Sequence, residues 1–491
     1  MGLLSLAIWT PIAFGVVLLA LGRDDQVRAV RWIALVGAVV SLLVTLPLYT
    51  QFDLSTAAMQ FVETRHWIET FNINYHLGID GISVWFILLT AFINLIVVIA
   101  GWEVITSRVN QYMGAFLILS GLMIGVFCAL DGMLFYVFFE ATLIPMYLII
   151  GIWGGPNKIY AAFKFFLYTL LGSLLMLVAL IYLYVTSGGS FDLLTWHKLP
   201  LGQTAQTLLF FAFLAAFAVK VPMWPVHTWL PDVHVEAPTG GSAVLAAIML
   251  KLGAYGFLRF SLPVTPDAAH EWAGLMIGLS LAAVIYVGLV TLVQTDMKKL
   301  VAYSSVAHMG FVTLGFFLFN DLGVAGGIVQ MVSHGFVSAA MFLGIGVLYD
   351  RVHSREISAY GGVVNTMPKF AVFAMLFAMA NAGLPGTAGF VGEWMVILAA
   401  LKVNFWVGMA AASALIFGAS YTLWMVKRVY LGPVTNDHVR HMKDINAREF
   451  FFLSLLAIAI LFMGLYPLPI TEVMDVSVAE LLKHVAITKL N

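Results

Sequence analysis

The chain has 491 residues, of which 62% are hydrophobic and 10% are charged, and its formal net charge is -1. Soluble domains are about 45 to 50% apolar and about 25% charged, so this composition excludes a soluble protein and predicts a polytopic membrane protein. A near-neutral charge without a basic stripe also argues against a nucleic-acid partner.

The first apolar run begins close to Met1. Residues 1–5 contain no basic side chain, whereas Arg23, Arg28 and Arg31 follow the run. A cleaved signal peptide has the opposite layout, with its positive charges before the apolar stretch. We therefore expect a retained first span whose N-terminal end lies outside.

Fourteen apolar segments, each about long enough to cross a bilayer, follow one another along the chain. The short alternating strands of a membrane barrel are missing from the sequence, so we predict an all-α protein in which each segment is a transmembrane helix. The segments cover residues 3–21, 32–50, 82–100, 111–130, 133–152, 165–186, 206–230, 240–260, 272–293, 300–319, 323–348, 370–400, 403–427 and 450–467.

The basic residues are divided unevenly between the two sets of connections. Sixteen fall in loops after odd-numbered segments and six fall on the other side, so the positive-inside rule predicts that both termini lie outside a bacterial cytoplasmic membrane. The sixteen are Arg23, Arg28, Arg31, Arg108, Lys158, Lys164, Lys298, Lys299, Arg351, Arg355, Lys369, Lys427, Arg428, Arg440, Lys443 and Arg448; the six are Arg65, Lys198, Arg259, Lys402, Lys483 and Lys489.

The single cysteine, Cys128, lies at the end of the fourth segment. One thiol cannot form an internal disulfide, a zinc site or an iron-sulfur cluster, because each needs several ligands. We expect Cys128 to be a core residue. Because the sequence also contains no G-x-G-x-x-G motif and no P-loop, it predicts no cofactor or metal in this chain.

Segments seven and twelve are interrupted. The seventh contains Lys220-Val221-Pro222-Met223-Trp224-Pro225, and the twelfth contains Gly383-Leu384-Pro385-Gly386-Thr387-Ala388-Gly389. Proline removes a backbone donor and glycine weakens a helix, so both helices should break inside the membrane. Breaks five segments apart predict two inverted five-helix repeats, segments 4 to 8 and 9 to 13. Two ordinary kinked packing helices are the alternative.

These repeats divide the chain into four parts. Residues 1–110 would hold segments 1 to 3, residues 111–260 the first repeat, residues 272–431 the second repeat, and residues 432–491 segment 14 and a tail.

Four charged residues lie inside predicted spans: Glu140, Lys220, Lys251 and Glu393. A charge in the bilayer is costly and persists only when it is paired or hydrated, and it usually marks an ion route. Burial disfavours the charged form and pairing favours it, so such groups change protonation with small changes around them. The pattern predicts a proton relay; the alternative is a Glu-Lys pair that only clamps helices together.

Histidines accompany these charges. His308 and His334, in segments ten and eleven, stand between Lys251 and Glu393 in chain order, and imidazoles titrate near neutrality. Either could instead be a hydrogen-bonded core residue. His227 and His234 flank the seventh break at a spacing that fits no metal motif. We expect that pair to be water-facing or capping groups near a channel mouth.

Residues 220–260 closely resemble the central signature of the proton-conducting antiporter-like family; their sequence is KVPMWPVHTWLPDVHVEAPTGGSAVLAAIMLKLGAYGFLRF. That family includes the L, M and N subunits of NADH-quinone oxidoreductase (respiratory complex I), Mrp-type antiporter subunits and membrane subunits of group 4 hydrogenases. The resemblance extends from segment four through segment thirteen and includes FEATLIPM at 139–146, KFFLY at 164–168 and AYSSVAHMG at 302–310.

The resemblance implies a role for each buried ionisable group. In the family, a glutamate of segment five and a lysine of segment seven form an input pair, a lysine of segment eight is central, histidines follow, and a charged residue in broken helix twelve leads to the exit. By position these roles fall on Glu140, Lys220, Lys251, His308, His334 and Glu393.

Glu393 separates the branches of the family, because the L and N branches usually carry lysine there. The chain is therefore most similar to the M branch. The resemblance implies L-type and N-type neighbours in a membrane arm, outward proton pumping, and NADH, flavin, iron-sulfur clusters and quinone in partner subunits. The alternatives are an Mrp-type cation/proton antiporter or hydrogenase subunit, a secondary transporter of a small solute, and a structural scaffold.

Overall fold

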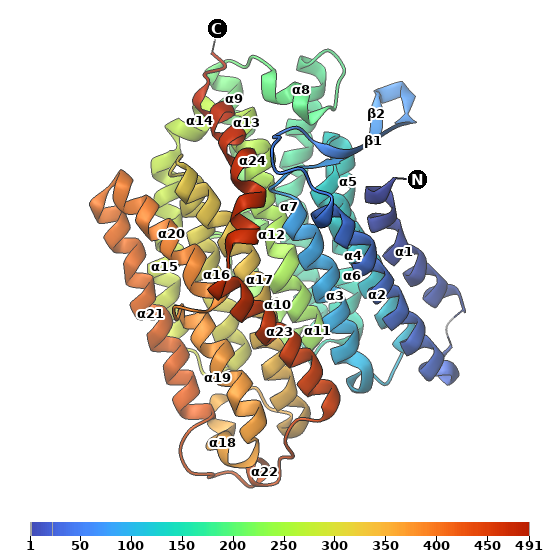
Figure 1. The fold of residues 1–491 in the computed structure, drawn as a ribbon, viewed down its shortest axis with the longest axis vertical. Helices are drawn as coiled ribbons and strands as arrows, with labels where there is room; N and C mark the ends of the chain where they lie inside the picture. Colours follow the sequence, from blue (N-terminus) through green and yellow to red (C-terminus); the bar gives the residue numbers. More distant parts are fainter. Residues whose placement is uncertain (1, 22, 491) are drawn as a thin grey trace.

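The computed structural model describes residues 2–21 and 23–490, and most of them are helical. The long helices lie side by side along the long axis of the molecule (Figure 1). Twelve helices of the described residues are long and apolar enough to cross a membrane. The prediction of an all-α polytopic membrane protein is confirmed.

The N-terminal part combines three long helices with a small antiparallel hairpin, which the count of apolar segments left unassigned. The hairpin lies at the same end of the molecule as α8 and the C-terminus (Figure 1). The elements are α1 (Leu3–Leu21), η1 (Asp24–Gln26), α2 (Val27–Thr50), β1 (Gln60–Ile68), η2 (Glu69–Phe71), β2 (Ile73–Ile79) and α3 (Val84–Val104).

The next part corresponds to the first predicted repeat. Its last span is one continuous helical run with two π-helical turns, η3 and η4, on either side of α12. The elements are α4 (Val109–Cys128), α5 (Gly132–Ala141), α6 (Leu143–Trp153), α7 (Lys158–Thr186), α8 (Leu193–Lys198), α9 (Gln203–Lys220), α10 (Trp229–Glu236), α11 (Thr239–Val244), η3 (Leu245–Met249), α12 (Leu250–Gly256), η4 (Phe257–Ser261) and α13 (Leu262–Val264).

The second predicted repeat and the C-terminal part follow. Their elements are α14 (Pro266–Glu271), α15 (Ala273–Leu292), α16 (Met297–Phe316), α17 (Asp321–Val352), η5 (Ile357–Ala359), α18 (Val363–Thr366), α19 (Pro368–Ala382), α20 (Ala388–Val403), α21 (Phe405–Val429), α22 (Asp437–Arg440), α23 (Ala447–Leu465) and α24 (Leu468–Ala486).

Both predicted helix breaks are confirmed. The seventh segment stops at Lys220 and resumes at Trp229, and the twelfth stops at Ala382 and resumes at Ala388. In the second break Gly383 and Gly386 have φ angles of 83° and 90°, which glycine adopts without the strain a side chain would cause. The division into two inverted repeats stays a prediction, as do its boundaries.

The count of fourteen spans also stays a prediction. Twelve of the predicted segments coincide with the twelve candidate spans, the tenth coincides with α16, and the twelfth with the broken pair α19 and α20. The helix α16 is less apolar because it carries Lys298, Lys299 and a run of polar side chains. The pair α19 and α20 is divided by the break.

The predicted C-terminal tail is largely an amphipathic helix, α24. Its apolar face packs against α13, α14 and α17. Beyond it, the Lys489 backbone N–H donates to Asp267 at 2.9 Å, and Lys489 Nζ donates to the carbonyl oxygens of Trp196 and Val264. Burial lowers the pKa of Lys489 to about 8. These contacts fasten the C-terminal segment to the end of the molecule that carries α8.

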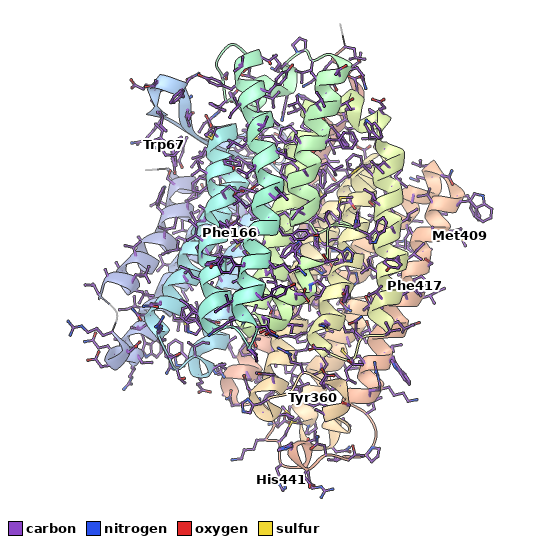
Figure 2. The ribbon with its side chains drawn as sticks, turned by 180° about the vertical axis from the view of Figure 1, so that it is seen from behind. Trp67, Phe166, Tyr360, Met409, Phe417 and His441 are labelled. Carbon is purple, nitrogen blue, oxygen red and sulfur yellow. The ribbon has the colours of Figure 1, made fainter. Side chains whose placement is uncertain are left out.

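The lateral surface and the interior differ as a membrane protein requires. Leu171 and Val185 on α7 are 72% and 70% exposed, whereas the 239–264 helix and α17 are completely buried in their most apolar stretches. Figure 2 shows Trp67 on the hairpin at one end and His441 at the other. Polar groups on the two buried helices are therefore shielded from lipid.

Arg259 corrects one detail of the charge count. It was assigned to an outer connection, but it lies in η4 and is 5% exposed. Its guanidinium forms a buried ion pair with Asp80 and donates to Ser83 Oγ at 2.9 Å and to the Tyr255 hydroxyl at 2.9 Å. The network ties the start of α3 to the 239–264 helix.

Candidate functional site

Lys251 stands at the centre of the buried polar residues. It lies on α12 between the two π-helical turns and is fully buried. Its Nζ is 2.6 Å from Nδ1 of His334 on α17 and 2.5 Å from the carbonyl oxygen of Ala246. A proton can therefore pass between Lys251 and His334 without an intermediate.

The two predicted histidines are neighbours. The imidazole rings of His334 on α17 and His308 on α16 have centroids 5.6 Å apart, and both side chains are buried. Ser333, next to His334, has a buried hydroxyl without a partner among the described residues. A small ring movement or one bridging water would connect the two imidazoles.

Glu393 lies at the second break and is the last member of the line that begins at Lys251. It lies in the second turn of α20, is 3% exposed, and its Oε1 is 2.6 Å from Nδ1 of His308. Gln330 Nε2 also donates to Oε1 at 3.3 Å. The structure thus brings Lys251, His334, His308 and Glu393 together from four helices, although they span 143 positions of the sequence.

Asn381 supports the second imidazole. Its side-chain oxygen is 3.2 Å from Nε2 of His308, and its amide nitrogen donates to Thr422 Oγ1 at 3.1 Å. In this orientation the amide accepts from a protonated Nε2. Rotated by half a turn, it would donate to an unprotonated Nε2 and accept from the Thr422 hydroxyl. The site therefore satisfies His308 in both protonation states.

Glu140 on α5 and Lys220 at the first break have no direct ion pair between them. Lys220 Nζ lies 4.9 Å from the ring centroid of Phe139 and 5.9 Å from that of Phe165. Neither Lys220 Nζ nor Glu140 Oε1 has a hydrogen-bond partner among the described residues, and no ion pair joins them there within 4.0 Å. The two groups interact electrostatically across a gap, and their role as an input pair stays a prediction.

Lys220 packs against α12, the helix that carries Lys251. A Cβ atom at Gly253 of α12 would be 2.9 Å from Lys220 Cβ and 2.9 Å from the backbone nitrogen of Val221. Only glycine permits that approach, which places the end of α9 two residues beyond Lys251 along α12. The first break is thus packed against the helix that carries Lys251.

His234 is a residue that the sequence placed incorrectly. It was expected to face water, but it is fully buried, and its ring stacks on Phe342 with centroids 4.4 Å apart. Both ring nitrogens lack a partner among the described residues, and the charges of Lys298 and Lys251 act on it. His227 is also buried, at 7% exposure. His234 therefore joins the polar interior next to Lys251.

Other contributors carried no recognisable signal. Gln330 and Asn381 were hidden among small and apolar neighbours. Lys164 forms a 2.6 Å ion pair with Asp232, which joins the start of α7 to α10 below the first break. Both residues of that pair lie within quoted motifs, but only the folded chain shows that they meet.

The described residues offer little to a metal. No group of three or more His, Cys, Asp or Glu side chains is arranged to hold a metal ion in residues 2–21 and 23–490. Cys128 is free and fully buried, so its prediction as a core residue is confirmed.

Two protein-family models and several known proteins match this chain. Residues 129–418 match the family described as NADH:quinone oxidoreductase/Mrp antiporter, and residues 31–129 match the amino terminus of NADH-ubiquinone oxidoreductase chain 4. NADH-quinone oxidoreductase subunit M of Rhodobacter capsulatus is 52% identical over 98% of this chain and 96% of that protein. NADH-ubiquinone oxidoreductase chain 4 of Arabidopsis thaliana is 47% identical over 98% and 97%.

Solved structures share the fold. A chain of respiratory complex I from Thermus thermophilus with bound NADH superposes with a TM-score of 0.87 at 31% identity, covering 98% of this chain and 99% of that one. A chain of the Mrp complex from Dietzia sp. DQ12-45-1b gives a TM-score of 0.82 at 22% identity, covering 98% and 52%, and shows likeness of fold alone. The chain therefore belongs to the proton-conducting antiporter-like family of membrane subunits, in the branch of subunit M of NADH-quinone oxidoreductase.

Proposed function

We propose that this chain is the proton-translocating membrane subunit of an NADH-quinone oxidoreductase and that its buried Glu, Lys and His side chains carry the protons. One observation supports this above all: Lys251, His334, His308 and Glu393 form a buried line of neighbouring ionisable side chains from the middle of one span to the break in another. Such a line is costly in a membrane and serves ion transfer better than packing.

The transfer steps follow from the contacts. Lys251 gives a proton to His334 across 2.6 Å, His334 passes it to His308, and His308 protonates Glu393 across 2.6 Å. Each donor is then ready to accept the next proton, so no electron and no covalent bond is involved. Asn381 keeps His308 hydrogen-bonded before and after it gives up its proton.

Glu140 and Lys220 would set the timing of these steps. The two charges stabilise each other across the gap between them, and Lys220 adjoins α12 at Gly253. When Glu140 takes up a proton, Lys220 loses its counter-charge, and its own proton becomes easier to release toward Lys251. The charge state of Glu140 and Lys220 thereby controls proton transfer along the line from Lys251 to Glu393.

The proposal also assigns the neighbouring subunits and the membrane. We place the chain in the membrane arm of complex I, between L-type and N-type neighbours, in a bacterial cytoplasmic membrane with both termini outside. NADH, flavin, iron-sulfur clusters and quinone belong to partner subunits. The 52% identity to a subunit M and the sixteen-to-six division of basic residues support this arrangement. An Mrp-type role has only a shared fold at 22% identity in its favour.

Composition and transport by the purified complex test the function. Reconstituted into sealed vesicles, the complex that contains this chain should oxidise NADH, reduce quinone and acidify the vesicle lumen. A complex without flavin and iron-sulfur subunits, exchanging protons for sodium without NADH, would contradict the proposal and favour the antiporter.

Glu393 provides a test of the exit end. Glu393→Gln keeps the size and removes the titratable carboxyl, so proton pumping should fall several-fold while assembly stays normal. Glu393→Lys should be better tolerated if the position needs only a charge, as the sister branches suggest. Acidification by vesicles and the yield of intact complex are measured together; two variants that both pump like the parent would remove Glu393 from the route.

Asn381 provides a second test, which concerns the hydrogen bond that it forms with His308 in both protonation states of the imidazole. Asn381→Leu leaves Nε2 of His308 buried without a partner, a cost of about 1 to 3 kcal/mol, so turnover should fall by about tenfold. Asn381→Asp favours the doubly protonated imidazole and should slow turnover too, because His308 then releases its proton reluctantly. Thr422→Val, which removes only the supporting hydroxyl, should have the smallest effect. Parental turnover in Asn381→Leu would show that His308 needs no such support.

A further inference from the structure

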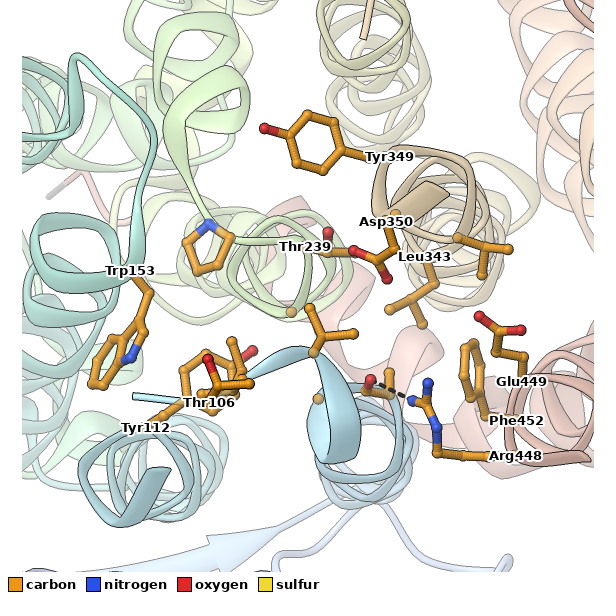
Figure 3. Close-up of a pocket in the computed structure, with 18 of the residues that line it drawn as sticks. Thr106, Tyr112, Trp153, Thr239, Leu343, Tyr349, Asp350, Arg448, Glu449 and Phe452 are labelled. Atoms are coloured by element: carbon orange, nitrogen blue, oxygen red, sulfur yellow. Dashed lines mark hydrogen bonds between the residues drawn. The ribbon is translucent and has the colours of Figure 1, made fainter. Parts of the chain in front are cut away.

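A cavity of about 350 Å³ with both polar and apolar walls lies between the ends of α3, α4, α6, α11, α17 and α23. Figure 3 shows Thr239 and Asp350 near its centre, with Tyr112 and Trp153 on one side and Arg448 and Glu449 on the other. The connections around it belong to the face that holds the sixteen basic residues. Its volume far exceeds the roughly 10 to 15 Å³ that one water needs.

Charged side chains hold this cavity open. The Arg448 guanidinium donates to the Ala100 carbonyl oxygen at 2.6 Å (Figure 3), and Arg351 forms a 2.8 Å ion pair with Glu449. The Asp350 carboxyl is exposed to the cavity, and the charges of Glu449, Arg351, Arg448 and His353 act on it. The charged part of the wall can therefore hold water and exchange protons with it.

The floor of the cavity is formed where α3 and α4 pack against α11. A Cβ atom at Gly240 would be 2.9 Å from Val97 Cγ1 on α3 and 3.5 Å from Phe116 Cζ on α4, with the Tyr112 hydroxyl also in contact. These side chains converge on Gly240, the second residue of α11. Val97 and Phe116 thus mark the place where α3 and α4 meet α11 at the cavity.

Two unpartnered polar side chains lie one turn deeper. Asn94 is three residues from Val97 on α3, and Ser120 is four residues from Phe116 on α4, so each continues the helix face that meets Gly240. They are 2% and 0% exposed, and both polar atoms of Asn94 and the hydroxyl of Ser120 have no partner among the described residues. Buried groups of this kind are normally satisfied by ordered water.

The same seam ends at the relay. Farther along α3, Leu89 packs where α17 and η3 meet: a Cβ at Gly335 would be 2.6 Å from Leu89 Cδ2 and 3.1 Å from the Ala247 carbonyl oxygen. Gly335 follows His334, and Ala247 follows Ala246, so both are next to the partners of Lys251. Asn94 therefore lies between the floor of the cavity and the central lysine.

We propose that this cavity and the seam between α3, α4 and α11 form a water path that supplies protons to Lys251, with Asn94 and Ser120 holding the water. The ligand is water and the excess proton it carries. The inference rests on the proposed function and adds an inlet to it. In this proposal α3, one of the three helices that precede both predicted repeats, contributes to transport.

Asn94 gives the direct test in the intact complex. Asn94→Leu keeps the side-chain size and removes both polar atoms, so turnover should fall at least about fivefold; combining it with Ser120→Ala should lower turnover further. Asn94→Ser leaves a hydroxyl and space for water and should stay within about twofold of the parent. Thr45→Val is the matched control, because Thr45 is fully buried on α2 and its hydroxyl bonds within its own helix.

Chemical labelling gives a second test that does not depend on a core substitution. Thr106→Cys places a thiol on the exposed cavity wall, while the native Cys128 stays buried. A bulky charged maleimide, applied to vesicles whose basic face is outward, should slow turnover several-fold. The same reagent on Thr435→Cys, in the exposed connection after α21, should have no effect.

The outcomes separate the inlet from the relay. Parental turnover in Asn94→Leu, or in labelled Thr106→Cys when Asn94→Leu does not assemble, overturns the path. If Lys251→Met stops turnover in the same preparation, the relay stands without this inlet. If Lys251→Met also turns over normally, the proposed function itself fails.

Discussion

Lys251→Met should assemble into the complex and then stop NADH-driven proton transport, with quinone reduction slowed at least about tenfold. Methionine keeps the length of the side chain and removes the ionisable amine. The loss leaves Nδ1 of His334 without its partner, a cost of about 1 to 3 kcal/mol. That is too small to account for a lost subunit, because the helix around it is buried along its whole length.

Lys251→Arg distinguishes a relay from a clamp. Arginine keeps the positive charge but does not release its proton in proteins, so a relay fails with it, whereas a purely structural cation would be replaced in part. Acidification of vesicles and NADH-dependent quinone reduction are measured beside the yield of complex. An assembled Lys251→Met complex that pumps at the parental rate would falsify the central role of Lys251.

Glu140→Ala and Lys220→Ala should each lose most of the turnover while the complex still forms. Breaking a direct buried ion pair costs about 3 to 5 kcal/mol. The cost here should be smaller, because Lys220 Nζ rests against the rings of Phe139 and Phe165 and has no carboxylate within 4.0 Å among the described residues. Assembly is therefore expected to survive, and the lost electrostatic interaction should appear in the rate.

Conservative variants refine this result. Glu140→Asp keeps the carboxyl one methylene farther from Lys220 and should retain part of the activity, and Glu140→Gln should resemble Glu140→Ala. Glu69→Gln, on the exposed turn of the hairpin, is the control for removing a carboxylate and should behave like the parent. Quinone reduction and acidification at parental rates in a well-assembled Glu140→Ala complex would show that the pair neither relays nor couples.

The helix breaks could be predicted because their cause is local. Proline at 222 and 225 and glycine at 383 and 386 prevent a regular helix wherever the chain places them. The charges and histidines inside apolar spans could be singled out from the sequence, but the order in which they line up could not. Chain order places His308 before His334, whereas His334 contacts Lys251 and His308 contacts Glu393, because α17 packs against η3 and α16 packs against α20.

The remainder depends on contacts between distant parts of the chain. His234 is buried because Phe342, 108 positions later, covers its ring. Arg259 is buried because it forms an ion pair with Asp80 at the start of α3. Neither partner is marked by spacing or composition. The gap between Glu140 and Lys220 is likewise set by the aromatic rings around the lysine, which no pairing rule for charges takes into account.

Because of the two π-helical turns around α12, the number of residues in this span decides the direction in which Lys251 points. A π turn contains about one residue more than an α turn, and each residue of an α-helix advances the side-chain direction by about 100°. Without the extra residue in Leu245–Met249, the helix would still cross the membrane, but Lys251 would point away from His334. A relative that lacks one residue there would keep the lysine in an alignment and lose it from the relay.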